Sequence, residues 1–143
     1  KRNLIDPSIA VAAMGLSPEY FNRDFQTLGF LFESLCIRDL KIYSSAFDGR
    51  MSYYRDRYGL EADGVLHLSD GRYALIEFKL GESGIDEGAR HLCEIERLVR
   101  ELNNKERQNR LRLPDLELVV TASQYGYRRD DGVLVVPIGC LKD

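Results

Sequence analysis

The chain has 143 residues, a common length for one domain with a real hydrophobic core, so we expect a single domain over residues 1–143. Charged residues make up 30% and hydrophobic residues 44%, without tandem repeats, low-complexity tracts or an apolar run long enough to cross a bilayer. This predicts a soluble, cytoplasmic protein without membrane contact. The net charge of −3 is unlike that of free-standing nucleic-acid-binding domains, which are usually strongly basic.

The three cysteines, Cys36, Cys93 and Cys140, are isolated, odd in number and set in apolar stretches. This pattern argues against a disulfide framework or a zinc cluster, and it predicts reduced cysteines in the core of a cytoplasmic protein. No signal peptide is visible. Because Lys1 stands in place of Met, we expect the chain to begin inside a longer gene product.

The first predicted element is a long helix over residues 27–46, with Asp24 or Thr27 as its N-cap. Apolar residues stand at nearly every helical offset and proline is absent, so this helix should be largely buried.

Glu33 is out of place in this helix, because it shares a face with Phe30, Ile37 and Leu40. Its carboxylate is therefore expected to point toward the interior or a cleft. One explanation is an ion pair with Arg38 or with an arginine of the sheet. The other is a functional carboxylate.

Three strands should follow as an antiparallel meander over residues 51–56, 60–68 and 72–80. The second strand carries Asp63, and the third carries Glu77 and Lys79 on one face. Charged residues inside strands cost free energy unless they are paired or hold a metal. Two carboxylates and a lysine on an apolar sheet therefore indicate metal-assisted phosphodiester chemistry.

The turn between the second and third strands decides whether the carboxylates meet. A two-residue turn at Asp70 and Gly71 would place Asp63 opposite Phe78. A three-residue turn over residues 69–71, with Gly71 in the left-handed conformation, would place Asp63 opposite Glu77. We predict the three-residue turn, or an equivalent bulge.

A second helix is expected over residues 86–104, after a break at residues 81–84, followed by strands over residues 116–122 and 132–137. The apolar stripe of this helix comprises Ala89, Leu92, Ile95, Val99 and Leu102. The order is then helix, three strands, helix and two strands. It predicts an α/β protein with a mixed sheet flanked by helices.

Residues 97–112 concentrate positive charge against Glu101 and Glu106. The basic residues are Arg97, Arg100, Lys105, Arg107, Arg110 and Arg112. This segment either faces phosphates or forms a solvated helix end, where cations complement the macrodipole.

Glu33, Asp63 and the Glu77-Phe78-Lys79 element resemble the PD-(D/E)xK, or restriction-endonuclease-like, phosphodiesterase superfamily, although Ala62 replaces its proline. The whole chain is similar to the C-terminal domain of uncharacterised bacterial and archaeal AAA-type ATPases, a family described only as a domain of unknown function. The segments that carry this second resemblance are residues 4–7 (LIDP), 29–35 (GFLFESL), 54–56 (YRD), 60–63 (LEAD), 127–129 (YRR) and 136–139 (VPIG).

The resemblance implies a restriction-endonuclease-like core of helix, three strands, helix and strand, with an extra C-terminal strand. It implies that Asp63, Glu77 and Glu33 bind Mg²⁺ or Mn²⁺ and that Lys79 orients the attacking water. DNA is the implied substrate. An N-terminal ATPase module is the implied partner, since these 143 residues contain no GxxxxGK followed by Ser or Thr.

Further residues have two interpretations each. Arg55 contacts a phosphate or holds Glu61 in a cross-strand pair. The tyrosines Tyr53, Tyr54 and Tyr58 stack on bases or cover the sheet as amphipathic residues. The two histidines, His67 and His91, are expected on the surface.

Two functions follow from these patterns. The first is a metal-dependent nuclease coupled to an ATPase. The second is a nuclease-like fold without activity, which the ATPase uses to bind a partner protein or nucleic acid.

Overall fold

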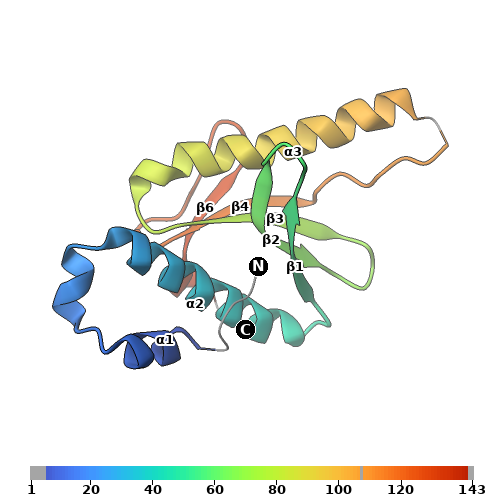
Figure 1. Ribbon diagram of the computed structural model, residues 1–143. Coiled ribbons are helices and arrows are strands. Elements are labelled where there is room, and N and C mark those ends of the chain that lie inside the picture. Colours follow the sequence, from blue (N-terminus) through green and yellow to red (C-terminus); the bar gives the residue numbers. More distant parts are fainter. Residues whose placement is uncertain (1–5, 107, 142–143) are drawn as a thin grey trace.

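A six-stranded mixed sheet with helices on both faces organises the computed structural model, which describes residues 6–106 and 108–141 (Figure 1). The prediction of an α/β protein with a mixed sheet is confirmed. Lys1, Leu4, Ile5 and Arg107 lie outside the described residues.

The helices are α1 (Pro7–Met14), α2 (Phe25–Ser45) and α3 (Ile85–Lys105), with 3-10 turns at Pro18–Asn22, Glu82–Gly84 and Ile138–Cys140. Of the two predicted caps for α2, Asp24 is correct, because its Oδ1 accepts a hydrogen bond from Thr27 N at 2.9 Å. Helix α1 was not predicted. Its N-cap Asp6 also binds Arg38 of α2, with 2.6 Å between Oδ2 and Nη1.

The strands are β1 (Arg50–Arg55), β2 (Glu61–His67), β3 (Tyr73–Lys79), β4 (Leu116–Thr121), β5 (Tyr127–Arg128) and β6 (Leu134–Pro137). They lie in the order β1-β2-β3-β4-β6-β5. The predicted antiparallel meander of β1, β2 and β3 is confirmed, whereas β3–β4 and β4–β6 pair in parallel. The two-residue edge strand β5 was not predicted. Strand β6 begins later than expected, because Gly132 has φ of +93° in the preceding turn.

Alternation along β3 divides the core between the two faces of the sheet. Leu75 packs under α3, whereas Ala74, Ile76 and Phe78 pack against α2. Helix α3 thereby covers one face and α2 covers the other, as Figure 1 shows.

Three sequence expectations about burial are wrong. Phe30 is 61% exposed, because the buried stripe of α2 runs through Phe32, Cys36 and Leu40 instead. Only Cys36 is a core cysteine, since Cys93 is half-buried and Cys140 is exposed, although all three are free thiols. Leu102 is 49% exposed, because the last turns of α3 extend beyond the sheet.

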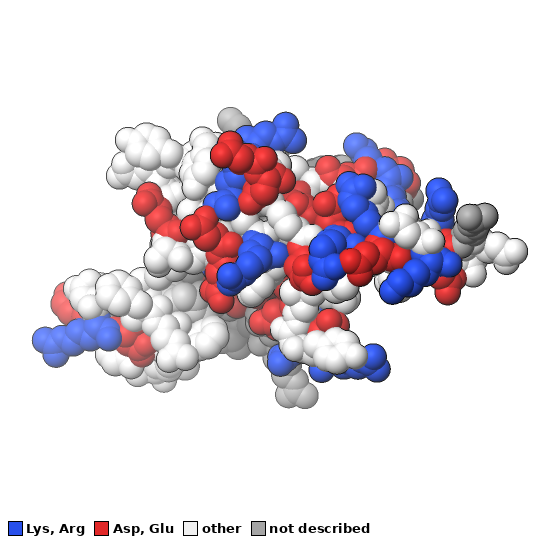
Figure 2. Space-filling model, turned by 90° about the horizontal axis from the view of Figure 1, so that it is seen from above, with Lys and Arg blue, Asp and Glu red and all other residues white. Residues whose placement is uncertain are grey.

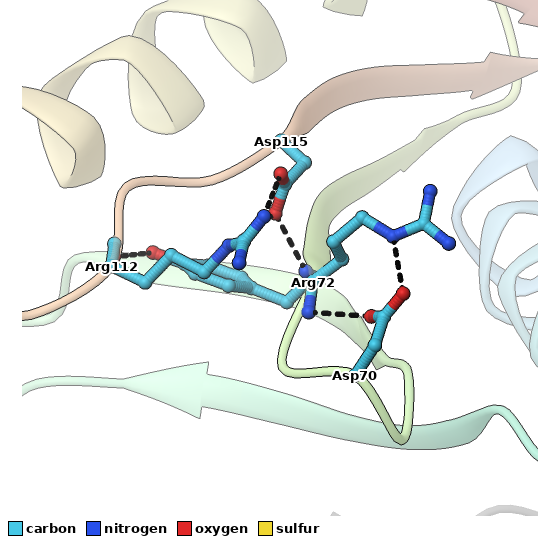
Figure 3. Close-up of polar contacts among 5 residues, drawn as sticks. Asp70, Arg72, Arg112 and Asp115 are labelled. Carbon is cyan, nitrogen blue, oxygen red and sulfur yellow. Dashed lines mark hydrogen bonds and ion pairs between the residues drawn. The ribbon is translucent and has the colours of Figure 1, made fainter.

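The beginning of β3 is anchored by charged residues on both sides (Figure 3). Asp70 accepts hydrogen bonds from the backbone N and the Nε of Arg72, at 3.0 and 2.7 Å. Asp115, which precedes β4, accepts one from Tyr73 N at 3.1 Å and is held by Arg112. These contacts hold the β2–β3 turn and the beginning of β4 at the same end of β3.

The core under α3 can be tested with a matched pair of substitutions. Leu92→Ala should lower the free energy of unfolding by about 3 kcal/mol, because Leu92 is fully buried and its loss leaves a cavity. Leu102→Ala, on the exposed end of the same helix, should cost less than about 1 kcal/mol. Urea unfolding measures both, and equal losses would contradict the described packing.

Candidate active site

A three-residue turn joins β2 to β3, as predicted. Leu68 N donates to Arg72 O at 2.8 Å, and Gly71 has φ of +85°, in the left-handed region. The pairing then runs from His67 opposite Tyr73 to Gly64 opposite Ile76. This register brings Asp63, the next residue of β2, to β3 near Glu77.

Strand β2 carries one extra residue at Asp63 and Gly64. Ser52 pairs with Val65 and Tyr54 with Ala62, so β2 advances three residues while β1 advances two. Such a bulge redirects side chains and is frequent next to functional sites. The Asp63 carboxylate turns to the backbone of β3, where its Oδ2 accepts a hydrogen bond from Phe78 N at 3.2 Å.

Glu77 is a buried carboxylate, with a side chain only 2% exposed. Lys79, two residues along on the same face of β3, places its Nζ 2.9 Å from Glu77 Oε2. The other oxygen, Oε1, has no hydrogen-bond partner among the described residues, and it lies 3.7 Å from His91 Nδ1. That separation is too long for a hydrogen bond.

The surroundings of this pair shift both ionisation equilibria. The pKa of Glu77 is raised to about 7, mainly by burial and then by the negative charge of Asp63, while Lys79 lowers it. Burial alone would lower the pKa of Lys79. The hydrogen bond and charge of Glu77, together with the charge of Asp63, outweigh this effect and raise it.

Two glycines allow the beginning of α3 to approach this pair closely. A Cβ at Gly88 would lie 3.0 Å from Lys79 Cε and 3.2 Å from Glu77 Cβ. A Cβ at Gly84 would lie 3.0 Å from Lys79 Cδ. Larger residues at either position would displace the lysine, so these glycines set the position of its side chain.

The contacts join three of the four residues predicted as catalytic, namely Asp63, Glu77 and Lys79. Glu33 is half-buried on α2, the helix that packs against the opposite face of β3. Arg55 lies on the edge strand β1, with its Nη1 3.8 Å from Glu61 Oε2 and both side chains well exposed. The cross-strand pair that the sequence allowed for Arg55 is therefore present.

The sequence analysis missed the contribution of α3. His91 was expected on the surface, yet its side chain is only 31% exposed and its Nδ1 faces Glu77. His91 stands three residues after Gly88 and four before Ile95, both of which are buried, so it lies at the border of the buried stripe of the helix. That spacing was the available signal. His67 is exposed, as expected.

Three of the five described basic residues of segment 97–112 pair with nearby carboxylates. Arg97 pairs with Glu94 and Glu101, Arg100 with Glu96, and Arg112 with Asp115. Figure 2 shows positive and negative side chains mixed over the face that carries α3. Of the two interpretations given above, a solvated helix surface fits these contacts better than a phosphate-binding one.

Among residues 6–106 and 108–141, no three or more His, Cys, Asp or Glu side chains are arranged to hold a metal ion. Within the same residues, no helix has the length and apolar character that a membrane crossing requires.

Residues 28–141 match the family model of a domain of unknown function, DUF4143. The match covers most of the chain, which therefore belongs to this family. Comparisons with curated proteins and with solved structures found no match.

The raised pKa values predict an unusual dependence of stability on pH. A carboxyl whose pKa is higher in the folded state takes up a proton on folding, so the free energy of unfolding should fall as pH rises from about 4.5 to about 7. Glu77 contributes to this fall. So does Glu117 on β4, where burial and the charge of Glu96 also raise the pKa to about 7.

Urea unfolding across this pH range tests the expectation. Glu77→Gln and Glu117→Gln should each remove part of the fall, and the double variant should remove most of it. Glu94→Gln should preserve it, because Arg97 lowers the pKa of Glu94 and its titration lies below this range. A wild-type stability that rises between pH 4.5 and 7 would contradict the raised pKa values of Glu77 and Glu117.

Proposed function

We propose that this domain is a metal-dependent phosphodiesterase that cleaves DNA. The observation that carries the proposal is the convergence of Asp63, Glu77 and Lys79 at one point of β2 and β3. A buried carboxylate with a raised pKa, beside a second carboxylate and a lysine, is typical of catalytic sites.

The donor set fits a hard divalent cation such as Mg²⁺ or Mn²⁺. Both carboxylates are oxygen donors, and Glu77 Oε1 is buried without a hydrogen-bond partner among the described residues. Mg²⁺ is commonly held by one or two carboxylates, with water and phosphate oxygens in the remaining positions. Two protein carboxylates therefore suffice, and Glu33 remains a predicted third ligand.

The residues would divide the chemistry among them. A bound cation would lower the pKa of a water molecule and offset negative charge on the phosphate. Asp63 and Glu77 would hold the cation, and Asp63 is oriented for this by Phe78 N. Lys79 would stabilise the charge that develops on the phosphate oxygens.

The element order supports assignment to the PD-(D/E)xK superfamily. Helix α2, strands β1 to β3, helix α3 and strand β4 follow the restriction-endonuclease-like order, with β6 as the extra C-terminal strand and β5 pairing to it. By the same resemblance, we propose that the domain works with an AAA-type ATPase module encoded upstream.

The second candidate function is a nuclease-like module without activity that binds a partner for the ATPase. The 2.9 Å contact between Lys79 and Glu77 favours it, because an ion pair that only stabilises the fold would have the same geometry.

Metal titration and DNA cleavage separate the two functions. Calorimetry should show saturable Mg²⁺ or Mn²⁺ binding, and at 100 times Kd the metal should stabilise the fold by about 2.7 kcal/mol. Asp63→Asn should remove both effects. Asp130→Asn, an exposed substitution in the turn between β5 and β6, should change neither.

Lys79→Ala should lower the rate of DNA cleavage by roughly 100-fold or more while the protein stays folded. The fold survives because Glu77, without its lysine, takes up a proton. Lys41→Ala, an exposed lysine on α2, is the matched control and should cleave at the wild-type rate. Absent metal binding together with intact single- and double-stranded DNA would reject the phosphodiesterase and leave the second function as the proposal.

A further inference from the structure

Strand β1 and the turn after it present a row of tyrosines and arginines at the edge of the sheet. Tyr58 is 79% exposed, Tyr53 is 55% exposed and Tyr54 is 37% exposed. Tyrosines that cover a sheet bury their rings, so these exposures argue against the amphipathic-cover interpretation. We call residues 50–58 the β1 ridge.

The ridge is positively charged, although the chain as a whole is negative. It carries Arg50, Arg55 and Arg57 against Asp56. Arg55 is paired with Glu61 at 3.8 Å, so Arg50 and Arg57 are the arginines assigned to a ligand here. Both turn amides Tyr58 N and Leu60 N donate to Asp56 Oδ1, at 2.8 and 2.9 Å, so this carboxylate is occupied in shaping the turn. Arg57 lies over the ring of Tyr58, with 4.7 Å from its Cζ to the ring centroid.

Tyr53 and Tyr54 also line a hollow of about 360 Å³ between the sheet and the C-terminal half of α3. Its other walls include Leu102 and Leu111, which are 49% and 54% exposed. An open apolar hollow beside arginines offers a place for a flat, partly apolar group attached to an anion. A nucleobase on its phosphate backbone has this chemistry.

The ridge adjoins the candidate active site directly. Tyr54 pairs with Ala62, the residue before Asp63, and the bulge in β2 lies opposite Tyr53. A strand bound along β1 would therefore pass next to Asp63. A base pair is already stacked within its duplex, whereas an unpaired base can be splayed onto an aromatic ring.

We propose that the β1 ridge binds single-stranded nucleic acid, with bases stacked on Tyr53 and Tyr58 and phosphates contacted by Arg50 and Arg57. The inference rests on the proposed phosphodiesterase function, because the bound strand is taken to be the substrate. It names the substrate class: a single strand, or a single-stranded region of a duplex, delivered to Asp63, Glu77 and Lys79.

Fluorescence anisotropy tests this binding with a labelled oligothymidylate, and EDTA removes divalent metal so that the probe is not cleaved. A length of roughly 16 nucleotides is chosen because it is the upper site size of single-strand-binding grooves. Tyr58→Ala and Tyr53→Ala should each weaken binding by about 5- to 100-fold, and Tyr58→Phe should restore most of it. Tyr125→Ala, a 73% exposed tyrosine near the opposite edge of the sheet, should bind like wild type. Arg57→Gln should reduce the slope of the logarithm of the binding constant against the logarithm of the salt concentration by about one, the value for one lost phosphate contact.

The outcomes separate this inference from the proposed function. Three results would overturn the inference, even if the domain cleaves DNA. They are equal affinities of the wild type and both tyrosine-to-alanine variants for the oligonucleotide, no saturable binding to it, or tighter binding to a blunt duplex. Binding that depends on Tyr53 and Tyr58, without cleavage in Mg²⁺ or Mn²⁺, would support the inference and reject the phosphodiesterase. Comparing the affinities for oligothymidylate and oligouridylate shows whether the ridge prefers DNA or RNA.

Discussion

The burial of the Glu77 carboxylate is the constraint on which the rest of this structure depends. A charge that is 2% exposed needs compensation, and Lys79 supplies it at 2.9 Å. The lysine keeps this position because Gly84 and Gly88 let α3 lie almost against its aliphatic stem. The turn at Gly71 and the bulge in β2 then bring Asp63 to the same place, which raises the pKa of Glu77 further.

Burying two carboxylates and a lysine costs desolvation free energy, so this arrangement is a poor way to stabilise a sheet. A buried ion pair is often no more stabilising than apolar residues of similar volume, because desolvation offsets the attraction between the charges. The neighbouring β3 residue on this face, Leu75, packs normally under α3, so an apolar residue at position 77 would extend the same core. Retaining two carboxylates and a lysine there is easier to understand if they act on a ligand than if they only hold strands together.

The sequence allowed prediction of those features that local chemistry decides. The period-two pattern of β3, the Asp24 cap and the left-handed Gly71 are all short-range, and the structure confirms them. The register of β2 and β3 followed from the turn alone. This is why Asp63 and Glu77 could be expected to meet before any tertiary contact was known.

Features that depend on distant packing were missed. The surface position of Phe30 follows from how α2 meets the sheet, and the half-buried position of His91 follows from how closely α3 approaches Glu77. The bulge at Asp63 and Gly64 arises from the pairing of β2 with β1, and the isolated Gly64 within the strand was the available signal. Glu33 lies on α2, which packs against the other face of β3, and its role as a third ligand stays a prediction.

Diffraction from crystals soaked in Mn²⁺, measured at the manganese absorption edge, would test the central claim most directly. The account predicts an anomalous peak in contact with carboxylate oxygens of both Asp63 and Glu77. A map without a peak at this site, in crystals where Lys79 still pairs with Glu77 at saturating Mn²⁺, would contradict it and identify the pair as a structural element of the sheet.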